Sequence, residues 1–333
     1  MAGSWLPHSL LRPFGRPVAL FFHGVEKRIE DGRIQTNHHD LNTFRGIARL
    51  LKENFDVLPL NAMSDVLRRP ERHRRAVFLM CDDGYENNLT VAADVLTEYA
   101  LPWTLFVSTH HIDTAERSPT FRARLFFFFA ANGQYAIPNL SGPVVLGSAS
   151  ERERAADRWL GELKALDAPR GDEAVGAMEA ALKTSDLSAL LERFRSDRFL
   201  TWPQIAVLKK RGVEIGAHAH RHWAMHAGQS ADYLREQASL ARGRVEAEIG
   251  PCRYFAYPFG NTLDICPQAW RAVREAGYEY AFTTLSGSLD ASINPYLLPR
   301  YGIGAREPRL ASLVPLLRLG NARLVAWQRQ ITP

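Results

Sequence analysis

Residues 76–85 read Ala-Val-Phe-Leu-Met-Cys-Asp-Asp-Gly-Tyr, an apolar run that ends in two carboxylates and a glycine. The run has no polar alternation, so it predicts a strand buried on both faces, as in a parallel sheet. Two carboxylates directly after such a strand are costly unless another group neutralises or uses them. Alone, the pair also fits the start of a helix, where an aspartate commonly caps the first turn.

Short apolar strands alternate with amphipathic helices along most of the chain. This order predicts an α/β fold with a largely parallel sheet. The alternation stops between residues 112 and 200, where helical periodicity alone predicts a mainly helical insertion. We expect strands at residues 17–22, 56–60, 76–81, 103–108, 213–216, 253–257 and 280–284, and helices at 41–54, 87–99, 202–211, 231–249 and 267–276.

The composition is that of an ordinary globular protein: 333 residues, 46% hydrophobic and 23% charged. It excludes disorder, collagen and coiled coil. No apolar run reaches the roughly 18–20 residues of a membrane span, and we find no secretory signal, so we expect a cytoplasmic protein. The 41 basic and 36 acidic residues are interspersed, which argues against a nucleic-acid partner. Three cysteines without CxxC spacing argue against a disulfide framework.

The most apolar part of the insertion is a run of four phenylalanines at residues 126–129. One interpretation is that the run packs the insertion onto the rest of the protein. A second is that it forms a lid or a wall for the substrate, since long loops commonly carry lids. A third is a peripheral membrane contact, made together with the basic residues around 318–329.

Residues 214–223 place three histidines just past another predicted strand. His218 and His222 are four residues apart, a spacing that puts two imidazoles on one side of a turn, as in other metal sites. With Asp83 they offer two nitrogens and one oxygen and leave positions open for water and substrate, which is typical of a catalytic metal. We expect His220 to point away from them. A solvated histidine cluster is the alternative.

Two further strand ends carry polar groups. In residues 253–261, strand alternation sends Arg253 and Tyr257 to one face, and Pro258 begins a sharp turn. Such a turn can aim the Tyr257 N–H at a developing oxyanion, and Arg253 can pair with a buried carboxylate. His23 emerges from the first strand and is a candidate general acid because the other segments require one.

Together these segments resemble the polysaccharide deacetylases of carbohydrate esterase family 4. The family signature runs Thr/Ser-Phe-Asp-Asp-Gly, then His-Ser/Thr-x-x-His, then Arg-x-x-x-Tyr-Pro, and the resemblance covers residues 18–108 and 202–284. It implies a distorted (β/α)7-type barrel, with residues 1–333 as one catalytic domain and residues 112–200 as its insertion. It also implies metal-dependent hydrolysis of an N-acetylated sugar, with release of acetate.

The resemblance implies a role for each matched residue. Asp82 would be the general base, oriented by Arg253, and Tyr257 the oxyanion donor. A divalent metal would be bound, with zinc preferred and cobalt or nickel as alternatives. Its ligands would be Asp83, His218 and His222. We also expect substrate contacts from the neighbours of these residues, Tyr85, Trp223 and Pro258.

The chain departs from the family pattern in the histidine motif and in the general acid. Ala219 replaces the serine or threonine after the first histidine, and no histidine follows His226, although most members have their acid near the C-terminus. Residues 22–25 instead resemble the branch that acts on poly-N-acetylglucosamine, which makes His23 the acid. Two alternatives stay open. One is a same-fold hydrolase of another C–N bond, and the other is an inactive carbohydrate-binding member.

Overall fold

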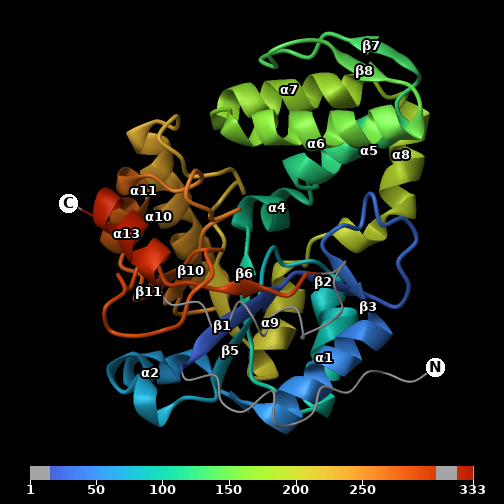
Figure 1. Ribbon diagram of the computed structural model, residues 1–333. Coiled ribbons are helices and arrows are strands. Elements are labelled where there is room, and N and C mark those ends of the chain that lie inside the picture. Colours follow the sequence, from blue (N-terminus) through green and yellow to red (C-terminus); the bar gives the residue numbers. More distant parts are fainter. Residues whose placement is uncertain (1–15, 305–320, 333) are drawn as a thin grey trace.

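The computed structural model describes residues 16–304 and 321–332. Its centre is a parallel sheet in the order β11-β10-β9-β6-β5-β1-β12, with β4 beside the start of β5. The sheet curves into a half-barrel surrounded by helices (Figure 1), which confirms the predicted distorted (β/α)7 barrel. Its strands are β1 (Val18–Phe22), β4 (Asp56–Val57), β5 (Ala76–Cys81), β6 (Thr104–Val107), β9 (Glu214–Ala217), β10 (Tyr254–Ala256), β11 (Tyr280–Phe282) and β12 (Tyr301–Gly302).

Three of the helices around the sheet, α1, α9 and α10, begin at a residue whose side chain caps the first turn. Asp40 accepts hydrogen bonds from two backbone N–H groups of the first turn of α1, and Thr201 forms a capping box with Gln204 on α9. The helices are α1 (Leu41–Asn54), α2 (Met63–Arg68), α3 (Ala93–Glu98) after a π-turn at Asn88–Ala92, α4 (Thr109–Thr114), α9 (Trp202–Lys210), α10 (Ala231–Glu248), α11 (Pro267–Glu275) and α13 (Ala322–Ile331). The short strands β2 (Gly24–Glu26), β3 (His38–Asp40) and β12 were not predicted.

Strand alternation divides the sheet residues between two cores. Leu20, Leu79 and Ile215 pack outward against the helices, whereas Phe21 and Met80 face the centre of the half-barrel. Because the side-chain period of a strand is two, a residue two places after an inward side chain also points inward. This rule sends three polar residues at the carboxyl ends toward the centre: His23, Asp82 and His218.

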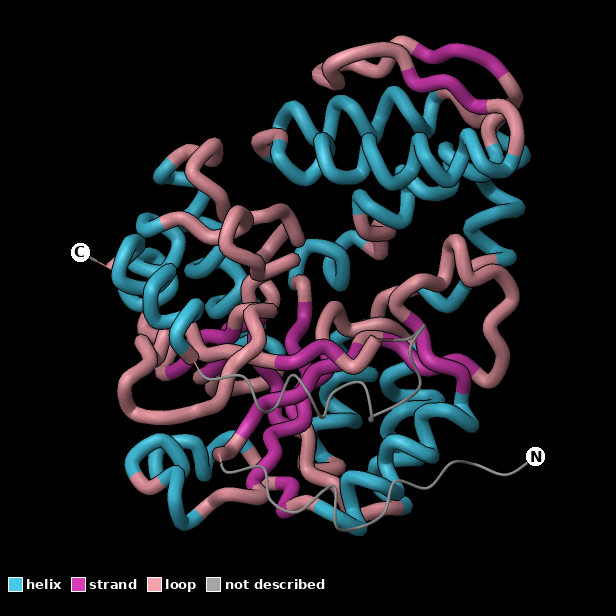
Figure 2. The backbone as a smooth tube through the Cα atoms, viewed as in Figure 1, coloured by secondary structure: helices cyan, strands magenta, loops and turns pink. Residues whose placement is uncertain are grey.

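The segment predicted as an insertion forms a helical layer beyond the barrel, topped by a hairpin that helical periodicity did not predict (Figures 1 and 2). It has its own hydrophobic core, in which Phe126 and Phe127 are fully buried. These side chains are therefore not available to a membrane, and the membrane interpretation of the run is wrong. Of the basic residues around 318–329, those before 321 lie outside the described residues. The elements are α5 (Pro119–Phe129), β7 (Gly133–Tyr135), β8 (Val144–Leu146), α6 (Ala149–Ala165), α7 (Ala168–Ala180) and α8 (Thr184–Arg193).

Among the described helices, none combines the length and the apolar character needed to cross a lipid bilayer.

Candidate active site

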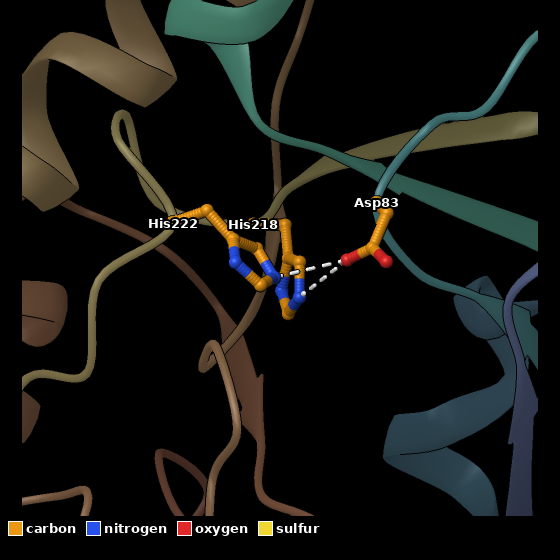
Figure 3. A group of neighbouring side chains, drawn as sticks. All are labelled: Asp83, His218 and His222. Carbon is orange, nitrogen blue, oxygen red and sulfur yellow. Dashed lines mark ion pairs between the residues drawn. The ribbon is translucent and has the colours of Figure 1, made fainter. Parts of the chain in front are cut away.

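Three potential metal ligands converge at the carboxyl ends of the strands. His218 and His222 turn their rings toward the carboxylate of Asp83 (Figure 3). The Asp83 Oδ1 atom lies 3.4 Å from Nε2 of His218 and 3.0 Å from Nε2 of His222. Within residues 16–304 and 321–332, this is the one group of three or more His, Cys, Asp or Glu side chains whose ligand atoms lie so close together.

The cluster fits a divalent cation. Asp83 Oδ1 is buried and has no hydrogen-bond partner among the described residues, although it faces two imidazole nitrogens. Burial would raise the pKa of Asp83, but His222 and His218 outweigh it and keep that pKa well below its usual value. A buried, unpartnered carboxylate is costly, and a cation bound between it and the two nitrogens would remove that cost. Two nitrogens and one oxygen suit zinc, cobalt or nickel.

Neighbouring groups fix the histidines in place. His218 Nδ1 lies 2.8 Å from the carbonyl oxygen of Ala256, which makes Nδ1 the protonated nitrogen and leaves the lone pair of Nε2 for a ligand. Ser108 Oγ donates to the His218 carbonyl, and Thr109 Oγ1 lies 2.8 Å from His220 Nδ1. These two hydroxyls, at the start of α4, brace the loop that carries Ala219 in place of a serine or threonine. His220 is thereby turned away from the cluster, as predicted.

The backbone around the cluster adopts left-handed conformations that non-glycine residues rarely adopt. The φ angles are +76° at Asp83, +57° at Ala219, +55° at His222 and +59° at Phe259. Such angles cost of order 1–3 kcal/mol each and persist only where the surrounding structure enforces them. Their concentration here marks the loops at this end of the sheet as a functional site.

Asp82 lies beside this cluster and is paired with an arginine that the sequence did not indicate. Both carboxylate oxygens of Asp82 accept hydrogen bonds from the Arg300 guanidinium, at 2.8 Å each. Both side chains are buried, Arg300 fully. Burial would raise the pKa of Asp82, but the charge of Arg300 outweighs it and lowers that pKa. Asp82 is thus an ionised carboxylate held by two parallel hydrogen bonds.

The prediction that Arg253 orients Asp82 is wrong. Arg253 precedes β10, at the opposite end of the sheet from the cluster, and its side chain is 43% exposed and bonded to Glu279. Strand alternation also places it on the outer face with Phe255. Arg300 takes its place because the end of the chain returns through β12 beside β1.

The predicted oxyanion role of Tyr257 is also contradicted. Its backbone N–H donates to the carbonyl of Phe282 at 3.0 Å, continuing the ladder between β10 and β11. Its hydroxyl donates to the carbonyl of Tyr296, and the ring is buried in the outer core. Both donors of Tyr257 are therefore occupied and directed away from the cluster.

Of the three predicted substrate contacts, one lines the cavity over the cluster. Tyr85 does so, with its ring between His38 and Phe199. Pro258 is buried and does not line it, whereas the next residue, Phe259, does. Trp223 is 1% exposed and lies in the core of the insertion, where its Nε1–H donates to Asp172 at 3.1 Å. It anchors the insertion rather than touching the cavity.

His23 reaches the same cavity from the end of β1. Burial lowers its pKa, although the nearby Asp83 and Asp82 oppose the shift. The cavity has a volume of about 300 Å³. It also contains a carboxyl group that the sequence analysis missed: Asp197, whose pKa burial raises to about 7 and whose Oδ2 accepts a hydrogen bond from Ser196. Its one sequence signal is an acidic residue two positions before an apolar pair, Phe199 and Leu200.

A parallel half-barrel with an Asp-His-His cluster and a buried, arginine-paired carboxylate defines a class of barrel hydrolases. Residues 69–281 match the polysaccharide deacetylase family, and the chain belongs to this family. No curated protein sequence matches the chain.

The fold is shared with solved deacetylases at low sequence identity. The Streptococcus pyogenes deacetylase PplD, solved with acetate, is 14% identical over 91% of this chain and 99% of its own, with a TM-score of 0.59. A de-N-acetylase from Aggregatibacter actinomycetemcomitans is 15% identical, with 90% and 99% covered and a TM-score of 0.54. IcaB from Ammonifex degensii is 14% identical, with 94% and 97% covered and a TM-score of 0.54.

Proposed function

We propose that the protein is a metal-dependent N-deacetylase that hydrolyses the acetamido group of an N-acetylated sugar and releases acetate and a free amino sugar. The observation that carries this proposal is the pairing of two adjacent carboxylates with different partners. Asp83 faces two imidazoles and Asp82 faces a guanidinium. One carboxylate is therefore suited to bind a cation and the other to accept a proton. Membership of the polysaccharide deacetylase family supports the same reaction.

The residues divide the reaction between them. Bound by Asp83, His218 and His222, a divalent cation would supply Lewis acidity toward the amide carbonyl and the attacking water. Asp82, kept ionised by Arg300, takes a proton from the water as its oxygen attacks the acetyl carbon. His23, on the same cavity wall, gives a proton to the nitrogen of the departing amine. The C–N bond breaks, and acetate and the amino sugar leave.

The test is acetate release from N-acetylglucosamine and its oligomers by protein stripped with a chelator and then reloaded with zinc or cobalt. We expect release only from the reloaded protein. Asp82→Asn should keep the metal but lower kcat by about 10²–10⁴-fold, because general-base catalysis contributes that much. Full activity in Asp82→Asn would overturn its role as the base. Bound metal without acetate release from any sugar would favour hydrolysis of another C–N bond, and a protein that binds no metal would be an inactive binding member.

A second test isolates the acid. We expect His23→Gln to lower deacetylation of the sugar by about 10²–10⁴-fold, because an amine cannot leave without a proton. Hydrolysis of an aryl acetate ester should change far less, since a phenolate leaves unprotonated. The two rates are measured on the same metal-loaded protein. An equal loss on both substrates would assign His23 a structural role instead.

A further inference from the structure

The insertion lines part of the cavity that contains the metal cluster. The barrel contributes one side of the cavity, with Asp82, Asp83, His218 and His222. Helices α5 and α6 of the insertion contribute another side, through residues that no motif of the sequence marked. They include two cations, Arg124 and Lys164.

Lys164 has no carboxylate partner within ion-pair distance among the described residues. Its Nζ lies 4.6 Å from the centre of the Phe259 ring, and that ring packs edge to face against the ring of the metal-site residue His222, with centres 5.2 Å apart. Asp264 acts on it electrostatically, but the Asp264 carboxylate instead accepts a hydrogen bond from the Asn261 N–H at 3.1 Å. The ammonium is thus half-buried beside the metal cluster, where the Phe259 ring and the more distant charge of Asp264 stabilise it without a direct ion pair.

The remaining charges of the cavity do not neutralise this cation. Asp82 is already paired with Arg300, and Asp83 faces the two imidazoles. The pKa of Asp197 is raised to about 7 by burial, so much of this carboxyl is uncharged near neutrality. Arg124 adds a second positive charge, with its Nη1 donating to the carbonyl of Arg33 at 3.1 Å.

We propose that Lys164 binds an anionic group of the substrate, a carboxylate or a phosphate, so that the protein acts on an acidic N-acetylated sugar. This inference rests on the proposed function and narrows its substrate. An ammonium is a compact point charge that pairs with either anion, and the positive charge of Arg124 on the same cavity wall adds to the attraction. The volume of about 300 Å³ is at the lower end for ligand pockets, which suits one sugar ring and its charged substituent.

The test compares kcat/KM for neutral N-acetylglucosamine with that for its 1-phosphate, its 6-phosphate and its uronic acid. We expect the wild-type protein to prefer one of the acidic sugars by about 10- to 100-fold, the size expected for hydrogen bonds to charged groups. Lys164→Gln should abolish most of that preference, whereas Lys164→Arg, which keeps the positive charge, should retain part of it. The phosphate and carboxylate arms identify which anion is bound. Equal kcat/KM values for neutral and acidic sugars in the wild type would overturn the inference.

Lys209→Gln is the matched control, because Lys209 is paired with Glu214 outside the cavity. It should leave the preference unchanged. Binding of N-acetylglucosamine 6-phosphate and of the uronic acid to the Asp82→Asn protein, measured by calorimetry, separates this inference from the proposed function. Binding that Lys164→Gln weakens, with no acetate released from any sugar by the wild type, would support the anion site and refute the deacetylase. Equal acetate release from neutral and acidic sugars would support the deacetylase and refute the anion site.

Discussion

Replacement of Arg300 by methionine is expected to destabilise the protein by about 3–5 kcal/mol, the usual cost of leaving a buried charge without its partner. The guanidinium is fully buried, and besides Asp82 it donates from Nε to the carbonyl of Thr283 at 3.0 Å. It also lies over the ring of Phe21, 4.4 Å from the ring centre. Methionine fills part of this volume, so the loss arises from the charge rather than from a cavity. Urea unfolding at pH 7 measures the difference.

The same variant should change the pH dependence of stability in a defined direction. In the wild type, the pKa of Asp82 is lowered on folding, so this group stabilises the fold above its unfolded pKa of about 3.9. That contribution is lost as the pH falls through the folded pKa. Without Arg300, the largest effect that opposes burial is lost and the pKa of Asp82 rises, so the neutral acid is favoured and stability falls as the pH rises. The difference between variant and wild type should therefore shrink on acidification.

Activity provides the second measurement for Arg300. A base with a raised pKa becomes active only at higher pH, so the acid limb of kcat/KM should move upward in Arg300→Met. Arg253→Ala is the matched control, since its ion pair with Glu279 is exposed and such pairs contribute about 0–1 kcal/mol. It should leave the acid limb in place. A shift of that limb in Arg253→Ala, with none in Arg300→Met, would refute the structural assignment.

Loss of one imidazole of the cluster is expected to have the largest effect on metal binding. His218→Ala removes a nitrogen that faces Asp83. Loss of a residue that only hydrogen-bonds to a metal ligand lowers metal affinity by about 10–100-fold. Loss of the ligand itself should lower it further. Acetate release should be lost with it. Competition with a chromophoric chelator gives the affinity, and elemental analysis gives the stoichiometry.

His220→Ala is the matched control for this variant. It lies in the same loop, but its ring is bonded to Thr109 and is not part of the cluster. Metal stoichiometry should stay at the wild-type value. Wild-type affinity in His218→Ala, or metal loss confined to His220→Ala, would contradict the assignment of the ligands.

Local sequence was sufficient to predict the elements and residues that follow apolar strands. The run before Asp82 indicated β5, and spacing alone paired His218 with His222, because both signals lie within a few residues. Arg300 could not be found in this way. It lies 218 residues from Asp82, next to the two-residue strand β12, which is too short to show any periodicity. The sequence feature that could have indicated a buried Arg300 is its position among mainly apolar neighbours in residues 297–303.

For Arg253, the strand pattern of the sequence already contained evidence against the role predicted for it. Arg253 and Asp82 sit at opposite ends of their strands, and Arg253 shares a face with the outward residues of β10. Strand parity therefore argued against their contact. Lys164, Asp197 and Trp223 differ, because their positions depend on how the insertion docks on the barrel. No periodicity within the insertion specifies that docking.

Trp223 directly follows the proposed metal ligand His222, and this adjacency links the insertion to the metal cluster. The indole sits so close to helix α7 that a Cβ at Gly171 would lie 2.4 Å from it. An insertion that swung away as a hinged lid would have to extract this side chain from its core or pull His222 from the cluster. Any cation that binds the folded cluster stabilises it by mass action, and that stabilisation extends through Trp223 to the docked insertion. We therefore expect metal removal to weaken the docking of the insertion as well as the loop that carries His222.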